Sequence, residues 1–365
     1  MSFTLDNLRR WPDFEAPDLR AWDAADTLIL DEAAALLSAA ELAVIGDSYG
    51  ALTLGALAGG ASRVRVHQDA LSGELALRAN GAGDYLSLPL EPALVEGATL
   101  VLLRLPRSLD ALDEIVALIA AHCAPAVVVI AGGRLKHMTL AMNEVLARHF
   151  GRVDVSLARQ KSRLLTAREP IRGPLVEPRR EFHADLGLTV VATGEVFAGT
   201  AVDIGTRAML AVLDGVPPYE RAVDLGCGTG ILAARLAQAR PAARVLASDQ
   251  SAAAVASARL TMTANNLDVR VTRDDALAQE PDGSADLIVL NPPFHSGAAV
   301  HSGVATKLFE AAARVLRPGG ELWTVYNSHL AHKPTLDSIV GQTREIARTA
   351  KFTVTASVAR DRSTR

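Results

Sequence analysis

The sequence Asn291-Pro292-Pro293-Phe294 combines residue types that can activate an aromatic amine. The amide oxygen of Asn291 and the carbonyl oxygen of Pro292 can each accept one N–H of an exocyclic amino group, which favours a pyramidal nitrogen with an available lone pair. The two prolines fix the backbone before reaction, and the Phe294 ring offers a face on which a flipped or single-stranded base can stack. The motif predicts methylation of an amine on a planar group. The structural alternative is a proline-rich turn with a capping Asn.

A glycine-rich stretch, Asp224-Leu225-Gly226-Cys227-Gly228-Thr229-Gly230, lies between an apolar segment and a helical one. In a nucleotide-binding sheet this is the first βα turn, where the backbone can approach a ligand closely. The third glycine of a dinucleotide fingerprint would fall at Ile231, and no Lys-Ser/Thr pair follows, so the spacing disfavours NAD, FAD and a triphosphate. An acidic residue before the glycines suits the positive charges of S-adenosylmethionine, which is the cofactor we predict.

The next two apolar segments also end in polar residues, Asp249-Gln250 and Asp274-Asp275. We expect Asp249 to accept both ribose hydroxyls and Asp275, in preference to Asp274, to accept the adenine amino group. Any one of these carboxylates could instead be a helix N-cap, but their position at the ends of consecutive strands favours a cofactor site. The predicted cofactor residues are Asp224, Gly226, Cys227, Gly228, Gly230, Asp249, Gln250, Asp274, Asp275 and Asn291.

The pattern around these motifs predicts a parallel sheet covered by helices, because apolar runs alternate with Ala- and Leu-rich stretches. The segments Thr343–Arg348 and Lys351–Val358 are too close for a crossover helix and predict a terminal β-hairpin. The site residues then follow the carboxyl ends of strands, where such sheets bind ligands. The other expected strands are Arg221–Asp224, Arg244–Ser248, Val269–Thr272, Asp286–Leu290 and Glu321–Tyr326, and the expected helices are Thr229–Ala239, Ser251–Asn265 and Val304–Val315, the last one ended by the sequence Arg317-Pro318-Gly319-Gly320.

The N-terminal half of the chain repeats the pattern of the C-terminal half. Glu41–Gly50 parallels Glu220–Gly230, and Leu100–Arg107 parallels Leu287–Phe294. We therefore expect an α/β protein of two tandem class I, Rossmann-like methyltransferase domains, each a mostly parallel sheet with helices on both faces, and a terminal hairpin in the second. The first copy has fewer spaced glycines and carries Arg104 in place of the amide, so we expect it to be degenerate and inactive. Similarity by fold class alone is the alternative.

Length and composition fit two globular domains, since the chain has 365 residues of which 49% are hydrophobic. Residues 168–182 contain three prolines and alternating charges, so we expect a linker there between domains 1–167 and 183–365. Cys123 and Cys227 give no disulfide framework, no apolar run could cross a membrane, and the first residues do not resemble a signal peptide. We expect a cytoplasmic monomer that needs no metal.

The net charge of −4 hides a basic segment. Between residues 134 and 180 there are eleven Lys and Arg against four Asp and Glu, a net of +7, which leaves −11 in the rest of the chain. Such a segment can track RNA phosphates, although a solvated linker flanked by charged helices has the same composition. Phe197 is a candidate lid over the substrate and His295 a candidate donor to base or phosphate. The basic residues predicted to contact RNA are Arg134, Lys136, Arg159, Lys161 and Arg163.

The motifs of the C-terminal half resemble those of the bacterial ribosomal RNA guanine-N2 methyltransferases of the small and large subunits. The resemblance is carried by DLGCGTG at 224–230, NPPFHSG at 291–297, the Arg-Pro-Gly-Gly turn at 317–320, Asn327–Leu330 and Lys351-Phe352. In the N-terminal half, Leu19–Asp26, Leu103–Ser108 and Gly133–Met138 resemble the large-subunit enzymes.

This resemblance implies two domains with a degenerate N-terminal copy, and transfer of a methyl group from S-adenosylmethionine to N2 of a guanine in 23S ribosomal RNA. By analogy Asn291 and Phe294 carry the catalytic roles. Ala198-Gly199 and Ser328 depart from the family, where a Ser and an Arg are common, so an RNA contact at Ser328 is in doubt. Alternatives that the residues leave open are guanine-N2 methylation of 16S RNA, adenine-N6 methylation, glutamine methylation in release factors, and a non-catalytic RNA-binding assembly factor.

Overall fold

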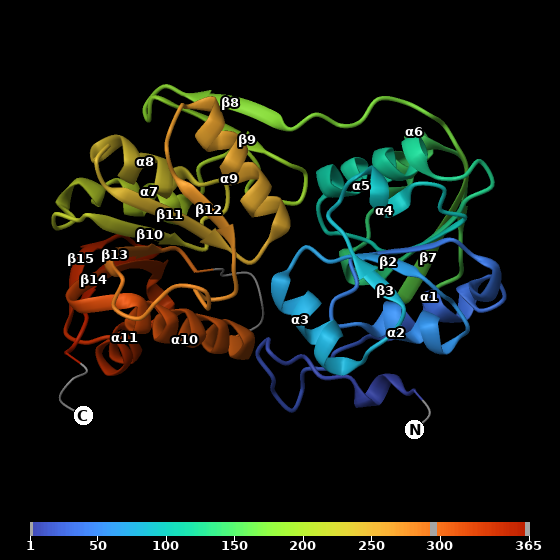
Figure 1. Ribbon diagram of the computed structural model, residues 1–365, viewed down its shortest axis with the longest axis horizontal. Helices are drawn as coiled ribbons and strands as arrows, with labels where there is room; N and C mark the ends of the chain where they lie inside the picture. The colour runs from blue at the N-terminus through green and yellow to red at the C-terminus, as the bar shows by residue number, and fades with distance from the viewer. Residues whose placement is uncertain (1–2, 293–297, 362–365) are drawn as a thin grey trace. The chain divides into compact units, whose positions relative to one another are not determined.

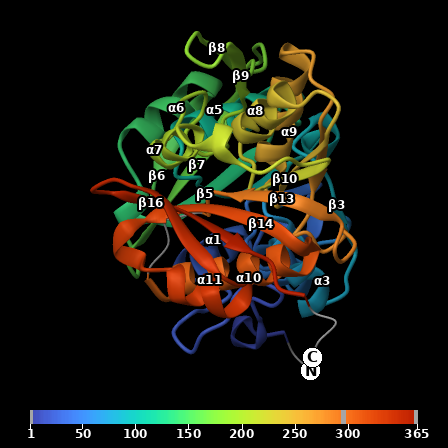
Figure 2. The ribbon, with the colours of Figure 1, turned by 90° about the vertical axis from the view of Figure 1, so that its left-hand side faces the viewer.

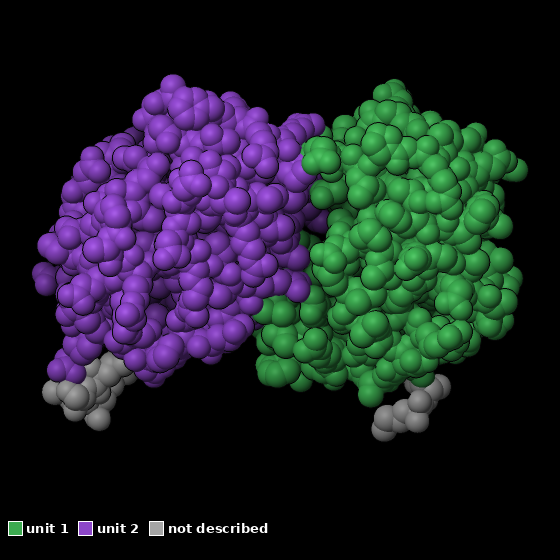
Figure 3. Space-filling model, turned by 45° about the horizontal axis from the view of Figure 1, so that its top comes forward, with its two compact units in different colours: residues 1–177 green, residues 178–365 purple. Residues whose placement is uncertain are grey.

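Both halves of the chain fold around a seven-stranded sheet with the same order of strands. The order is β3-β2-β1-β4-β5-β7-β6 in unit 1, Met1–Glu177, and β12-β11-β10-β13-β14-β16-β15 in unit 2, Pro178–Arg365 (Figure 3). The computed structural model describes residues 3–292 and 298–361. In each sheet the first five strands in this order are parallel to one another, and the last two pairings, β5 with β7 and β7 with β6 or β14 with β16 and β16 with β15, are antiparallel. The predicted α/β fold of two tandem, Rossmann-like sheets is confirmed.

Unit 2 contains the strands and helices that the sequence predicts around the site (Figure 1). Alternate residues of its buried strands face opposite sides of the sheet, as the pleat requires. Its strands are β10 (Arg221–Leu225), β11 (Arg244–Asp249), β12 (Arg270–Arg273), β13 (Ala285–Leu290), β14 (Leu316–Asn327), β15 (Thr343–Arg348) and β16 (Phe352–Val358), and its helices are α7 (Ile204–Leu210), α8 (Ile231–Ala239), α9 (Ala252–Ala264), α10 (Ala298–Val315) and α11 (Lys333–Ile339).

Helices cover both faces of the unit 2 sheet. Ala222 packs in one core cluster with Leu232 of α8 and Met262 of α9, while Val223 packs in another with Phe309 of α10. Figure 2 shows α8 and α9 on one side of the sheet and α10 and α11 on the other. Burying a side chain such as Phe309 contributes about 1.5–3 kcal/mol, so the two cores together hold the strand ends that carry the site.

Unit 1 has the same layers, with α1 to α3 on one face of its sheet and α4 to α6 on the other. Leu28 of α1 and Leu52 of α2 pack with Val44, and Leu112 of α5 and Met142 of α6 pack with Ile45. Its elements are α1 (Ala24–Ala33), β1 (Leu42–Ile45), α2 (Ala51–Ala58), β2 (Val64–His67), α3 (Leu71–Asn80), β3 (Tyr85–Ser87), α4 (Pro92–Val95), β4 (Leu100–Arg104), α5 (Leu109–His122), β5 (Val128–Arg134), α6 (Ala141–His149), β6 (Phe150–Val155) and β7 (Ser162–Pro170).

The structure differs from the expected elements at several boundaries. Unit 1 also ends in an antiparallel pair, β6 with β7, which the sequence analysis does not predict because charged residues interrupt the apolar alternation there. Helix α10 begins at Ala298 and not at Val304. Residues 317–320 do not end this helix as a separate turn but lie in β14, where a register shift opposite β13 accommodates Gly319 at a positive φ of 77°.

Strands also enter both ends of the segment 168–182. Strand β7 continues to Pro170, and β8 (Arg179–His183) pairs with β9 (Leu188–Ala192) as a separate two-stranded sheet. Cys123 and Cys227 are buried free thiols. Over residues 3–292 and 298–361, no helix has both the length and the apolar composition of a membrane span, and no three His, Cys, Asp or Glu side chains are grouped so that they could hold a metal ion.

Candidate active site

Three neighbouring strands bring the predicted motifs to one edge of the unit 2 sheet. Strand β10 lies between β11 and β13, with Leu225 aligned to Ser248 on one side and to Leu290 on the other. Gly226 follows β10 directly, Asp249 is the last residue of β11, and Asn291 follows β13 directly. The carboxyl edge of the sheet therefore carries the predicted cofactor loop beside the predicted catalytic Asn, as expected for a ligand site in a doubly wound sheet.

The glycines of the loop at 224–230 have two different surroundings. Gly226 and Gly228 have φ values of +72° and +53°, and a Cβ added to either would meet nothing within 4 Å. Gly230 has a φ of +81°, and its added Cβ would lie 2.7 Å from Met262 Cε and 3.2 Å from Ala258 Cβ. The first two glycines therefore leave open space beside the backbone, which fits a closely bound ligand, whereas the third allows α8 to pack against α9.

Asp224 lies in β10, just before the glycines, and is buried. It is 1% exposed, and its Oδ2 accepts the backbone N–H of Ala233 at 2.9 Å. Burial raises the pKa of Asp224 to about 7, opposed by the Ala233 N–H and supported by the negative charge of Asp249. Burial, with Asp249 and Asp224, also raises the pKa of the Cys227 thiol well above its usual value. Asp224 thus holds the first turn of α8, and Cys227 stays a neutral thiol.

Asp249 and Gln250 lie against the same loop. Asp249 Oδ2 accepts from Gly228 N at 3.0 Å and its Oδ1 accepts from Ser251 N at 2.9 Å, so this carboxylate joins the loop to the start of α9. The Oε1 atom of Gln250 is buried and has no hydrogen-bond partner among the residues that the structure describes. A buried acceptor without a donor is unfavourable, and a ligand donor at this position would satisfy it.

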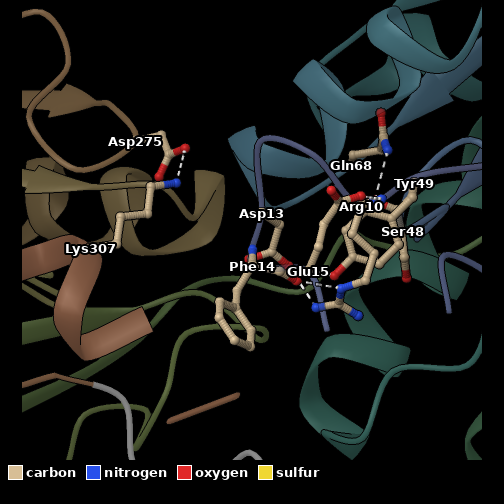
Figure 4. Close-up of polar contacts among 9 residues, drawn as sticks. All are labelled: Arg10, Asp13, Phe14, Glu15, Ser48, Tyr49, Gln68, Asp275 and Lys307. Carbon is tan, nitrogen blue, oxygen red and sulfur yellow. Dashed lines mark hydrogen bonds and ion pairs between the residues drawn. The ribbon is translucent and has the colours of Figure 1, made fainter. Parts of the chain in front are cut away.

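The carboxylates of Asp274 and Asp275 are both engaged. Asp274 is buried and accepts from Gln279 N at 3.0 Å. Asp275 accepts from Lys307 Nζ, on α10, at 2.6 Å (Figure 4). Sequence reasoning missed Lys307 because the helix that carries it lies far along the chain. The adenine contact of Asp275 stays a prediction, and in this site it would share the carboxylate with Lys307.

The amide of Asn291 is hydrogen-bonded through its nitrogen, whereas its oxygen has no donor among the described residues. Its Nδ2 donates to Thr206 Oγ1 at 3.1 Å and lies 3.4 Å from each carboxylate oxygen of Asp203. Its Oδ1 is buried and meets no donor from the described part of the chain. The site therefore presents a fixed, buried acceptor without a donor, as the activation of an amine requires.

The rest of the predicted catalytic turn is described in part. Pro292 is buried, whereas Pro293, Phe294 and His295 lie outside the described residues. Phe197, the candidate lid residue, is 61% exposed. Asp203 and Thr206 were missed by sequence reasoning, although an Asp-x-x-Thr sequence before an apolar segment is a recognisable helix start.

Four of the basic residues predicted to contact RNA stand at adjoining backbone positions in unit 1. Arg134 ends β5 and is aligned with Ser162, the first residue of the adjacent β7, and Arg163 is the second residue of β7. The backbone N–H of Leu135 donates to Lys161 O at 2.9 Å, which brings Lys136 beside the same turn. Arg159 instead forms an ion pair with Asp31.

Electrostatics in unit 1 agree with this grouping. The pKa of His137 is lowered by burial first and then by the charges of Arg107, Lys136 and Arg134. A lowered histidine pKa is the expected response to nearby positive charge. Arg134 and Lys136 thus lie near His137, while Lys161 and Arg163 lie on the adjoining turn and strand. We call these four residues the basic cluster, and their contact with RNA stays a prediction.

The corresponding edge of unit 1 is filled by the chain itself. Tyr49, in the loop equivalent to the cofactor loop, donates to Asp13 Oδ2 at 2.6 Å, and the Arg10 guanidinium lies 4.6 Å from the Tyr49 ring centroid (Figure 4). Asn80 Nδ2 donates to Tyr49 O and to Arg9 O, both at 2.8 Å. The N-terminal segment thus lies on the loop that in unit 2 borders open space.

Known families and structures match both halves of this chain. The Methyltransferase small domain matches residues 187–356, and the RLMG N-terminal domain matches residues 2–170. Proteins named ribosomal RNA large subunit methyltransferase G are similar along almost the whole length: the one from Shewanella amazonensis is 34% identical and the one from Streptomyces avermitilis 35% identical, each over 96% of both chains.

A solved structure is also similar over both units. It is the T. thermophilus 16S rRNA N2 G1207 methyltransferase in complex with AdoMet and guanosine, with a TM-score of 0.78 and 25% sequence identity over 95% of each chain. The similarity therefore spans both units.

Proposed function

This chain belongs to the family of the ribosomal RNA large subunit methyltransferase G, and from that premise we propose that it transfers a methyl group from S-adenosylmethionine to the exocyclic N2 of a guanine in 23S ribosomal RNA. The observation that carries the proposal is the buried Oδ1 of Asn291, an acceptor with no donor among the described residues. The similar structure from T. thermophilus, solved with AdoMet and guanosine, supports the same donor and base.

The residues of unit 2 bind and orient the two reactants. Gly226 and Gly228 leave room beside the loop, and Gln250 offers a buried acceptor there. When bound, S-adenosylmethionine supplies an electrophilic methyl group on a sulfonium. Asn291 Oδ1 accepts one N–H of the guanine amine, and we propose that the carbonyl oxygen of Pro292 accepts the other. The amine lone pair then points away from the ring plane toward the methyl carbon, so orientation supplies much of the rate.

The remaining parts of the proposal concern the RNA and the setting of the reaction. We propose that the basic cluster of Arg134, Lys136, Lys161 and Arg163 binds RNA phosphates, that unit 1 does not bind the cofactor, and that Phe294 stacks on the base. The chain would act as a monomer in the cytoplasm, where ribosomal RNA is made. The experiment must distinguish this function from four alternatives. These are methylation of 16S RNA, methylation of an adenine N6, methylation of a release factor, and a non-catalytic role in assembly.

The test compares the wild-type chain with Asn291→Ala, using labelled S-adenosylmethionine. Wild type should label protein-free 23S RNA at a guanine, located by mass mapping, and should leave 16S RNA and release factors unlabelled. Asn291→Ala should lower kcat by about a hundredfold or more, because the acceptor stabilises the transition state. Calorimetry should give nearly the same cofactor affinity for both chains. Label in protein alone, or full activity of the variant, would contradict the proposed function.

A further inference from the structure

Helix α7 holds the amide of Asn291 through the first two polar side chains of its N-terminal turn. Asp203 is the N-cap of α7 and accepts the backbone N–H groups of Gly205 and Thr206 at 2.8 and 3.3 Å. The Asn291 Nδ2 atom lies 3.1 Å from Thr206 Oγ1 and 3.4 Å from both oxygens of Asp203. Residues far apart in sequence therefore meet through one amide group.

The hydrogen bonds decide which end of the amide faces the helix. Thr206 Oγ1 donates its proton to Asp203 Oδ2, so the same hydroxyl can only accept from Asn291. An ionised Asp203 also only accepts. Both partners thus require the donor end of the amide, Nδ2, and exclude Oδ1. The oxygen is left buried beside Gly205, with no donor in the described part of the molecule.

Gly205 allows this close approach. A Cβ added at Gly205 would lie 2.9 Å from Asn291 Oδ1 and 3.2 Å from its Nδ2. Any side chain at that position would therefore push the amide away from the first turn of α7. The first turn of α7 is therefore capped by Asp203, and its glycine leaves room for the amide of Asn291.

Unit 1 repeats the same contact with different residues. Arg104, which ends β4 as Asn291 follows β13, pairs with Asp23 at 2.8 Å and Asp26 at 2.6 Å. Asp23 is the N-cap of α1, and Asp23 and Asp26 stand 180 positions before Asp203 and Thr206. The contact between a capping turn and a strand end is thus common to both units. In unit 1 it holds a guanidinium, which has no acceptor; in unit 2 it holds an amide that keeps one.

We infer that Asp203 and Thr206 are positioning residues that fix the amide of Asn291 with Oδ1 toward the substrate amine. This inference rests on the proposed function of Asn291. A rotated amide would present Nδ2 to an amine that is itself a donor, and no activating hydrogen bond would form. The contact of Thr206 and Asp203 with the donor end prevents that rotation before the substrate arrives.

The matched pair Thr206→Val and Thr206→Ser tests the inference in the full chain. Valine has nearly the shape of threonine but cannot accept from Asn291, whereas serine keeps the hydroxyl. Thr206→Val should lower kcat by about tenfold to a hundredfold, with the KM for S-adenosylmethionine and the melting temperature nearly unchanged. Thr206→Ser should keep most of the wild-type kcat. Wild-type kcat in Thr206→Val, or an effect on cofactor KM alone, would overturn the inference.

A double-mutant cycle separates positioning from a general structural effect. If Thr206 acts through Asn291, Thr206→Val should cause no further loss in an Asn291→Ala chain. An equal loss in both backgrounds would contradict a positioning role.

The side-chain amide signal of Asn291 in NMR spectra gives a readout that needs no activity. The signal is identified by its absence in Asn291→Ala, and it should shift in Thr206→Val but stay near its wild-type position in Thr206→Ser. An unmoved signal in Thr206→Val would overturn the contact. If Asn291→Ala kept full activity, the proposed function would fail while this signal would still decide the contact.

Discussion

The buried carboxyl of Asp224 stabilises the start of α8 beside the predicted cofactor loop. Its Oδ2 accepts from Ala233 N, and burial raises its pKa to about 7 from an ordinary value of 3.8. The folded state then binds the Asp224 proton more tightly than the unfolded state. The stability that this group contributes is complete below about pH 3.8 and is lost as the pH rises through about 7.

The substitution Asp224→Asn should remove that pH dependence. Its amide oxygen can still accept from Ala233 N, but the side chain does not titrate. The free energy of unfolding of wild type, minus that of the variant, should therefore fall between about pH 4 and about pH 8, with the variant gaining relative stability at the higher pH. Urea unfolding at a series of pH values measures this difference. A difference that does not change with pH would mean that the pKa of Asp224 is the same in the folded and unfolded states.

Residues are predictable from sequence where the chemistry itself demands a type and a spacing. The predictions for Asn291, Gly226 and Gly228 are of this kind, because an amine needs an acceptor and a closely bound ligand needs a bare backbone. Thr206 and Lys307 are not, because their roles depend on side chains that only the fold brings near. An N-cap pattern alone indicates a helix start and says nothing about the amide that it will hold.

At the scale of elements, the glycines in the turn from β10 into α8 have two different roles, leaving space for a ligand and allowing two helices to pack closely. Gly226 and Gly228 border open space, whereas Gly230 lies against Ala258 and Met262 of α9. All three have positive φ, so an alanine at any of them carries a backbone penalty of about 1–2 kcal/mol. The penalties beyond that differ with the surroundings.

Gly228→Ala and Gly230→Ala should therefore have separable effects. The Cβ at 228 enters the space that we propose for the cofactor, so calorimetry should show a large loss of S-adenosylmethionine affinity and only the backbone penalty in stability. The Cβ at 230 would lie 2.7 Å from Met262 Cε, so urea unfolding should show the greater loss of stability for this variant. Equal losses of affinity and stability in both variants would refute the division of roles.

The prediction of strands is wrong where the local pattern of apolar residues disagrees with the pairing that the strand makes in the fold. Strands β6 and β7 contain several charges, yet they pair with each other and β7 pairs with β5, because their apolar residues Phe150, Leu164 and Leu165 are buried in the unit 1 cores. The Pro and Gly at 318–320 predict the end of the preceding helix, which does end at Val315, but the following strand begins at Leu316 and not at Glu321, because the bulge in β14 includes these residues. The central strands β10, β11 and β13 are almost continuously buried apolar runs, and their predicted bounds differ from the observed ones by at most a residue or so.

Across the whole molecule, the two copies of one fold differ in the side chains at the ends of corresponding strands. Unit 1 places Arg104 between Asp23 and Asp26, whereas unit 2 places Asn291 beside Asp203 and Thr206. The duplication was visible in the sequence because both copies keep the strand and loop patterns. The sequence did not indicate that the segment around Arg10 packs on the loop of unit 1 that corresponds to the predicted cofactor loop. The composition of that segment does not show where it packs.

Charge is also divided along the chain, and this division is testable through RNA binding. Residues 134–180 carry a net +7 while the whole chain carries −4. Lys136 and Lys161 are exposed and have no ion-pair partner within the described ranges. In the double variant Lys136→Gln/Lys161→Gln, RNA affinity should fall and the slope of log K against log salt should flatten by about 0.7 to 0.9 for each phosphate that the variant no longer neutralises.

The matched control is Arg63→Gln/Arg78→Gln, which removes the same charge from unit 1 at exposed ion pairs with Glu41 and Glu74. If the attraction for RNA came from net charge alone, both double variants would weaken binding equally. A local cluster that contacts phosphates instead predicts a smaller salt slope for the lysine variant and an unchanged slope for the arginine one. Filter binding of 23S RNA at several salt concentrations distinguishes the two, because slope counts released ions whereas affinity at one salt concentration does not.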